Sequence, residues 1–181
     1  ASAFCCCSSL EQIIIESSLT EIKPYTFSKC SSLKTISIPP LIKSIENDLF
    51  NGCTSLSEIS IPPLVTSIGE RAFYRCSSLK QILIPSSVTL IGCYAFKECK
   101  KLSQITNLSS LISIENGTFY GCSSIEQIII PQSVICIKDH VFSHCSSLKQ
   151  IEIPSSVTSI GSYVFNECTS LTQITIPSSV T

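Results

Sequence analysis

The sequence of 181 residues contains no methionine, no tryptophan, only six glycines and only two histidines. Charged residues make up 14% of the chain, and the formal net charge is −1. A balance this close to neutral excludes a strongly basic surface for nucleic acid and an acidic tail. No signal peptide is visible, and the apolar runs, such as residues 128–130, are far shorter than the ~18 residues of a membrane-spanning segment.

The common sequence signatures of catalysis are also missing. The chain has no G-x-S-x-G motif, no P-loop and no dinucleotide fingerprint. His140 and His144 stand four residues apart and could share one face of a helical turn, but two ligands do not make a zinc site. A nucleophilic serine needs a positioned base, and both histidines fall in one short segment. We therefore predict no enzyme activity, no cofactor and no metal.

The sequence consists instead of one short unit copied many times. Cysteine follows phenylalanine by three residues in every copy, and isoleucine follows it by nine, without insertion or deletion. The phenylalanines are separated by steps of 23 residues: Phe4, Phe27, Phe50, Phe73, Phe96, Phe119, Phe142 and Phe165. Self-similarity at a period of 20–50 residues is typical of solenoid proteins. The spacing predicts eight repeats of 23 residues that fill the chain.

One repeat, residues 79–102, predicts the path of every coil. Ile82 and Ile84 alternate with their neighbours in the period-2 pattern of a strand, and Pro85 ends that strand because it cannot donate a ladder hydrogen bond. Later in the unit, apolar residues at 95, 96 and 99 have the spacing of a short α- or 3₁₀-helical turn.

A 23-residue unit cannot bury its apolar side chains alone, but stacked units can. We expect the strands to line up in a parallel sheet about 4.8 Å apart. The columns predicted to point inward are those of Phe73, Cys76, Leu79, Ile82, Ile84, Val88 and Ile91, with their 23-spaced equivalents.

The pattern L-x-x-I-x-I-P-x-x-V-x-x-I-G-x-x-A-F-x-x-C-x-x-L resembles the BspA-like class of leucine-rich repeats. The segments CSSLKQILIPSSVTLIG, from residue 76, and CSSLKQIEIPSSVTSIG, from residue 145, carry every family position. The resemblance implies a strand-rich, right-handed leucine-rich-repeat solenoid of the α/β horseshoe class. In it a parallel sheet lies on the concave face, and short 3₁₀ or helical turns and extended segments lie on the convex side. We expect residues 1–181 to form a single array, a fragment of a longer one that lacks caps.

The resemblance also implies a function. Proteins of this class occur on the surface of oral bacteria and protozoan parasites and are often adhesins for host matrix or other cells. We therefore expect a cell-surface or secreted protein whose partner is a host matrix or cell-surface protein. No nucleic acid and no membrane insertion of this segment are expected. A structural spacer or antigenic stalk with no ligand of its own is the alternative.

Two copies depart from the pattern. Glu16 replaces the proline of the first repeat, and Asn107-Leu108 replaces Ile-Pro in the fifth. We expect Asn107 to point inward, to bond nearby backbone and to cause a local irregularity. Asn107 and Asn116 both begin N-glycosylation sequons, and Asn116, at a convex corner, is the better candidate for a glycan.

Eight of the twelve cysteines form one column of the repeat. Stacked neighbours would be close enough for bridging, but identical neighbours on both sides specify no pairing, so a ladder of buried free thiols is the simpler prediction. Cys5 and Cys6 lie at the N-terminal end, where they could cross-link two chains. Self-association through open solenoid ends is a further expectation.

The outward side chains of the predicted strands form two columns. Glutamine occupies six of eight positions in the first, and stacked amides can bond one another along the solenoid. The columns can therefore be a solvated structural ladder or a neutral protein-binding strip with Leu83 and Ile129 as apolar anchors. The candidate strip comprises Gln81, Leu83, Gln104, Thr106, Gln127, Ile129, Gln150 and Glu152.

A second candidate surface lies on the convex side, where basic and aromatic residues gather in the fourth and fifth repeats. They could bind an acidic partner or a glycan, whereas Glu70 and Glu98 dilute the positive charge and favour a solvated face. The group comprises Arg71, Tyr74, Arg75, Tyr94, Lys97, Lys100 and Lys101.

Overall fold

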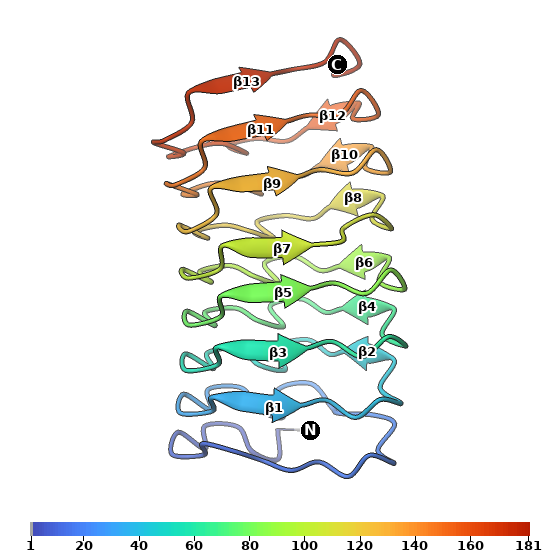
Figure 1. The fold of residues 1–181 in the computed structure, drawn as a ribbon, viewed down its shortest axis with the longest axis vertical. Helices are drawn as coiled ribbons and strands as arrows, with labels where there is room; N and C mark the ends of the chain where they lie inside the picture. The colour runs from blue at the N-terminus through green and yellow to red at the C-terminus, as the bar shows by residue number, and fades with distance from the viewer. Residues whose placement is uncertain (1) are drawn as a thin grey trace.

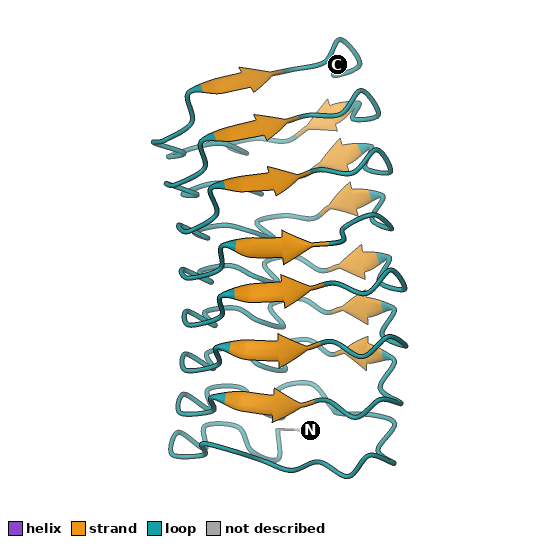
Figure 2. Cartoon of the chain, viewed as in Figure 1, coloured by secondary structure: helices purple, strands orange, loops and turns teal. Residues whose placement is uncertain are grey.

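The computed structural model describes residues 2–181 and shows a parallel-sheet solenoid whose coils stack along one axis (Figure 1). From β1 to β12, each coil passes through a longer strand on one side and returns through turns and a shorter strand on the other (Figure 2). In the described part of the chain, the N-terminal coil carries no strand, and no shorter strand follows β13. The longer strands are β1 (Thr35–Ser37), β3 (Glu58–Ser60), β5 (Gln81–Leu83), β7 (Gln104–Thr106), β9 (Gln127–Ile129), β11 (Gln150–Glu152) and β13 (Gln173–Thr175). The shorter strands are β2 (Ser44–Ile45), β4 (Ser67–Ile68), β6 (Leu90–Ile91), β8 (Ser113–Ile114), β10 (Cys136–Ile137) and β12 (Ser159–Ile160).

Every recorded strand pair is parallel and keeps the 23-residue register of the sequence. Ile36 lies opposite Ile59 in β1 and β3, and Gln150 of β11 lies between Gln127 and Gln173. The longer strands form three hydrogen-bonded groups, β1-β3, β5-β7 and β9-β11-β13, and the shorter ones form β2-β4-β6 and β8-β10-β12. Residues at the same position in neighbouring coils are therefore 23 residues apart in the sequence.

The interior consists of stacked columns of identical side chains. Neighbouring phenylalanine rings from Phe4 to Phe165 lie 5.3–5.9 Å apart between centroids and within 16° of parallel. The predicted inward columns are confirmed in the middle of the stack, where their side chains are at most 2% exposed: Phe73, Cys76, Leu79, Ile82, Ile84, Val88 and Ile91. Burial weakens toward the ends, where Phe4 is 39% exposed.

Residues 2–181 contain no helix (Figure 2). Non-helical turns occupy the positions where short helical turns were predicted. Backbone N–H groups of even-numbered residues from Tyr94 to Glu98 donate to carbonyls of the next coil at 2.7–3.0 Å. Odd-numbered residues from Ala95 to Cys99 donate to the carbonyl three residues earlier at 3.1–3.2 Å. Because every second N–H serves the next coil, the segment cannot satisfy its donors locally, as a helix would.

Left-handed backbone conformations produce this alternation. Two positions in each coil, four residues apart, have φ between about 51° and 75°. The first column comprises Ser2, Tyr25, Asp48, Arg71, Tyr94, Gly117, His140 and Tyr163. The second comprises Cys6, Lys29, Gly52, Arg75, Glu98, Gly121, His144 and Glu167. Glycine takes this conformation freely, whereas other residues pay a steric cost for it, yet most of these positions are not glycine.

The cysteine column is a ladder of free thiols. From Cys30 to Cys168, each Sγ donates to the phenylalanine carbonyl 26 residues earlier at 3.1–3.2 Å, as Cys99 does to Phe73. Burial raises the pKa of Cys30 to about 11 and that of Cys53 to about 12. These thiols remain protonated and occupy the interior as small apolar groups with one hydrogen bond each.

The structure corrects the prediction for Asn107 but confirms a local irregularity there. Asn107 is exposed and left-handed, with φ of 66°, and Leu108 is buried in its place at 5% exposure. The Asn107 amide Nδ2 donates to the Ile84 carbonyl at 2.8 Å. A polar residue at the inward position therefore leaves the core, and the left-handed turn lets the next apolar residue enter it.

Candidate binding surfaces

The eight residues of the predicted strip all lie exposed on the longer strands β5, β7, β9 and β11. We call the surface formed by the outward side chains of β1, β3, β5, β7, β9, β11 and β13 the long-strand face. Its two apolar anchors are open to solvent, with Leu83 65% and Ile129 85% exposed. Side chains alternate across a strand, so the buried residues between them, such as Ile82 and Ile128, fix which side chains face outward.

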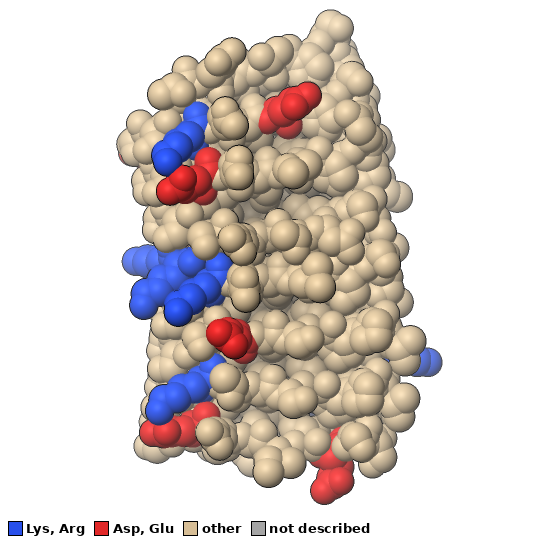
Figure 3. Space-filling view, in the orientation of Figure 1, with Lys and Arg blue, Asp and Glu red and all other residues tan. Residues whose placement is uncertain are grey.

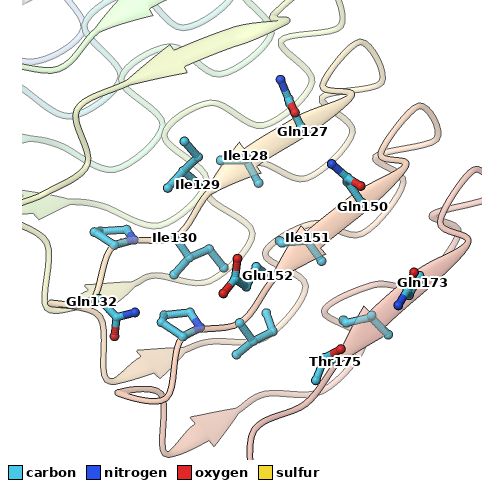
Figure 4. Close-up of a pocket in the computed structure, with 14 residues that line it drawn as sticks. Gln127, Ile128, Ile129, Ile130, Gln132, Gln150, Ile151, Glu152, Gln173 and Thr175 are labelled. Carbon is cyan, nitrogen blue, oxygen red and sulfur yellow. The ribbon is translucent and has the colours of Figure 1, made fainter.

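The structure divides the strip into two shallow grooves rather than one continuous surface. One groove of about 640 Å³ is lined by residues of β1, β3, β5 and β7, including Leu83. The other, of about 750 Å³, is lined by β9, β11 and β13 with the segments that follow β9 and β11, including Ile129 (Figure 4). The division falls beside Asn107, whose left-handed backbone directly after β7 ends the extended conformation of that strand. The absence of a pair between β7 and β9 does not by itself divide the face, because β3 and β5 are not paired either and line one groove.

The glutamine side chains of the long-strand face do not form the amide ladder considered from the sequence. No side-chain hydrogen bond joins Gln81, Gln104, Gln127, Gln150 or Gln173 to any other residue in the range 2–181. Figure 4 shows the amides of β9, β11 and β13 projecting from successive strands. Their donors and acceptors are therefore available to a ligand.

Charge is scarce on the long-strand face and gathers along one edge of it (Figure 3). At that edge Lys34 pairs with Glu11 at 2.8 Å and Lys149 pairs with Glu126 at 2.7 Å. Both pairs are exposed, so each contributes little to stability. Within the grooves the carboxylates are Glu58 and Glu152, one in each.

A second surface carries all five tyrosines, both histidines and the cations Lys29, Arg71, Arg75 and Lys97. We call the surface formed by the two left-handed columns and the residues between them the turn face. His140 and His144 lie here, and both contact the ring of Tyr120, with centroids 6.4 Å and 5.0 Å away. The histidines and the nearby carboxylates form no cluster of three metal-ligating side chains within residues 2–181. The His–Tyr contacts were not visible in the sequence because they join residues about 20 positions apart.

Of the two sequon asparagines, Asn116 is half-buried and its Oδ1 accepts from the Asp139 N–H at 3.1 Å. Asn107 is the more exposed of the two, and its Nδ2 donates to the Ile84 carbonyl. Burial therefore does not favour Asn116 as the glycan acceptor, and glycosylation at either site stays a prediction. Within residues 2–181, no helix is long and apolar enough to cross a membrane.

Comparison with known proteins identifies the class of repeat. The family model of the BspA type leucine rich repeat region, with six copies, matches residues 1–106 and 66–181. The chain therefore belongs to the BspA-type leucine-rich-repeat family, and its solenoid is a leucine-rich-repeat fold. No curated protein matches the chain.

Solved bacterial structures share the fold. A leucine-rich repeat protein from Bacteroides ovatus is 36% identical with a TM-score of 0.96, and the match covers 99% of this chain and 46% of that protein. The T. pallidum leucine-rich repeat protein is 26% identical with a TM-score of 0.82, and the match covers 90% and 78%. A leucine-rich cell surface protein from Faecalibacterium prausnitzii is 27% identical with a TM-score of 0.53, and the match covers 96% and 67%. The chain thus spans about half the length of the Bacteroides ovatus protein.

Proposed function

We propose that the chain is a non-enzymatic protein-binding module and part of a cell-surface adhesin, built as one array of eight coils over residues 1–181. Its partner would be a host matrix or cell-surface protein. The single observation that carries the proposal is the long-strand face, where Leu83 and Ile129 stand exposed among polar side chains, with one carboxylate in each groove. The stacking of phenylalanine rings from Phe4 to Phe165 supports eight coils, and the likeness to a cell surface protein supports the location.

The grooves have the chemistry of a protein-binding surface. Each offers one exposed apolar anchor, amide groups with free hydrogen-bonding capacity and one carboxylate. In register, Ile129 of β9 lies beside Glu152 of β11, so an apolar contact and a charged contact are adjacent. Apolar anchors surrounded by polar groups are typical of the energetic centre of a protein interface.

A spacer is the second candidate, and the uniform glutamine column favours it. A stalk needs only a repeated, solvated surface. The last five of the longer strands all begin with glutamine: β5, β7, β9, β11 and β13. The two candidates differ in their expectation for the apolar anchors, since a spacer needs no exposed leucine or isoleucine.

The test measures binding of the purified chain to immobilised matrix proteins and to host cells. Leu83→Lys and Ile129→Lys place a charge at the centre of each groove, and each is expected to weaken binding about tenfold or more. Ile112→Lys is the matched control, because Ile112 is an isoleucine 60% exposed outside both grooves. All three variants should keep the thermal transition of the parent chain.

Binding that survives both groove substitutions would reject the long-strand face as the binding site. A chain that binds none of the matrix proteins or cells would favour the spacer.

A further inference from the structure

The turn face carries a compact group of cations and tyrosines on three successive coils. We call it the cation–tyrosine cluster, and it comprises Arg71, Tyr74, Arg75, Tyr94, Lys97 and Tyr120. It lies away from the long-strand face and has no part in the function proposed above. None of the three tyrosines belongs to the hydrophobic core, and all three are half-buried.

Two cations in the cluster are held against aromatic rings. The Lys97 ammonium lies 4.1 Å from the centroid of Tyr120 and 5.2 Å from that of Tyr94. The Arg75 guanidinium lies 5.2 Å from the centroid of Tyr74. Such contacts hold the positive groups in defined positions before any ligand arrives.

The same two cations have no carboxylate partner. Arg71 is paired with Glu70 at 3.1 Å, and Glu98 is paired with Lys100 at 3.5 Å. Arg75 and Lys97 form no ion pair with any residue from 2 to 181. In a chain with a net charge of −1, this cluster is therefore a local site of uncompensated positive charge.

The surface is hollowed at the cluster. A shallow groove of about 430 Å³ is lined by Asn51, Arg71, Tyr74, Tyr94 and Lys97. The Tyr94 ring lies against the next coil at Gly117, where an added Cβ would come within 2.4 Å of Tyr94 Cε1. Glycine at 117 therefore leaves the space that this ring occupies.

The backbone of the repeat fixes where these side chains start. Arg71, Arg75 and Tyr94 all have left-handed φ values between 51° and 59°. The same conformation recurs at two positions in each coil, so it sets the spacing of the cluster's side chains from coil to coil and does not by itself mark a site.

We infer that the cation–tyrosine cluster binds an acidic polysaccharide whose sugars carry sulfate groups. The sulfates would pair with Arg75 and Lys97. The Asn51 Nδ2 donates to Asp48 Oδ1 at 2.7 Å, so its Oδ1 is the atom that would accept from ring hydroxyls. Tyrosine offers an apolar ring and a polar hydroxyl, which suits the apolar face and hydroxyl rim of a sugar. The coils repeat about every 4.8 Å, close to the length of one sugar unit, so successive coils can contact successive sugars.

The test uses heparin, chemically desulfated heparin, poly-glutamate and a single-stranded oligonucleotide as probes at physiological salt. The purified chain should bind heparin and should bind the other three at least about tenfold more weakly. Lys97→Ala and Tyr94→Ala should each weaken heparin binding by about tenfold. Lys149→Ala, which removes a charge from the long-strand edge, and Tyr163→Ala, which removes a 66% exposed tyrosine, are the controls and should change it less than about twofold.

Three results would overturn the inference. The first is an absence of heparin binding by a chain whose thermal transition is intact. The second is equal binding of poly-glutamate or the oligonucleotide, which would show simple charge attraction or a different class of partner. The third is equal loss in the control variants, or heparin binding that is unaffected by Tyr94→Ala in a folded protein.

Discussion

The long-strand face and the turn face come from the same 23-residue unit but vary differently along the stack. On the long-strand face, the column that begins each strand from β5 to β13 is glutamine throughout. On the turn face, the left-handed column from Tyr25 to Tyr163 holds tyrosine, aspartate, arginine, glycine and histidine. The backbone is extended and paired on the first face, whereas it is left-handed and costly for most residues on the second. The second outward column of the longer strands, from Ser37 to Thr175, holds as many residue types as the left-handed column, so both faces vary along the stack. The turn face differs in carrying that variety on a backbone that is costly for it, which makes it as strong a candidate for recognition as the sheet.

The two faces share one interior, and removing part of it should disturb both. Phe96 is fully buried between Phe73 and Phe119, with ring centroids 5.3 Å and 5.9 Å away. Phe96→Ala should lower the free energy of unfolding by about 3–5 kcal/mol, because it removes a large side chain and leaves a cavity. Chemical denaturation measures the loss, and Phe4→Ala, at a ring already 39% exposed, should cost clearly less. Equal losses at the two positions would contradict the stacked core.

The thiol ladder, which lies under the turn face, should make stability depend on alkaline pH. Burial raises the pKa of Cys53 from 9.0 to about 12, so this thiol stays protonated in the folded chain while the unfolded chain ionises. Its contribution is fully present below about pH 9 and is lost between pH 9 and about 12, by up to about 1.4 kcal/mol per pH unit. Urea unfolding from pH 8 to 11 measures the slope. Cys53→Ala should reduce the slope by the share of this one thiol, because burial also raises the pKa of Cys76, Cys99, Cys122 and Cys145. An unchanged slope in that variant would show that Cys53 does not contribute to the dependence.

The sequence predicts the interior and the outward strip well, because both depend on a strict period. Inward residues such as Ile84 and outward residues such as Leu83 follow from strand alternation alone. The helical turn could not be distinguished in this way, since apolar residues at 95, 96 and 99 suit either a helix or two linked left-handed turns. Hydrogen bonds to the next coil favour the left-handed turns over a helix, as the bond from the Tyr94 N–H to the Asn116 carbonyl shows. Such a bond joins two repeats, so the sequence of one repeat does not reveal it.

Asn107 shows the second limit of prediction from the repeat pattern. Its position in the repeat indicates the interior, but the cost of burying an amide exceeds the cost of a local left-handed turn. The long-strand face divides into two grooves beside this left-handed turn, and no single residue type in the repeat predicts such a division.

Restoring the repeat at this point should make the long-strand face more uniform. The double variant Asn107→Ile with Leu108→Pro recreates the Ile84-Pro85 sequence and is expected to extend β7 and pair it with β9. The free energy of unfolding should rise by up to about 1 kcal/mol, because removal of the strained turn outweighs the lost bond to Ile84. Hydrogen exchange should slow at the backbone of β9. Unchanged exchange there would mean that Asn107 is not what separates the two grooves.

The smallest expected effect tests the backbone contrast between the two faces within a single coil. Lys29 is exposed, makes no ion pair within residues 2–181 and has φ of 59°, so Lys29→Gly relieves a left-handed strain. The relief is partly offset by the greater freedom of glycine in the unfolded chain, which leaves a gain of up to about 1 kcal/mol. Thr35 is exposed in the extended strand β1 of the same coil, so Thr35→Gly should instead lose about 0.5–1 kcal/mol. Thermal and urea unfolding of the two variants side by side measure the opposite signs. A loss in both would show that the turn face tolerates its side chains without strain, and the two faces would then not differ in the backbone cost of their side chains.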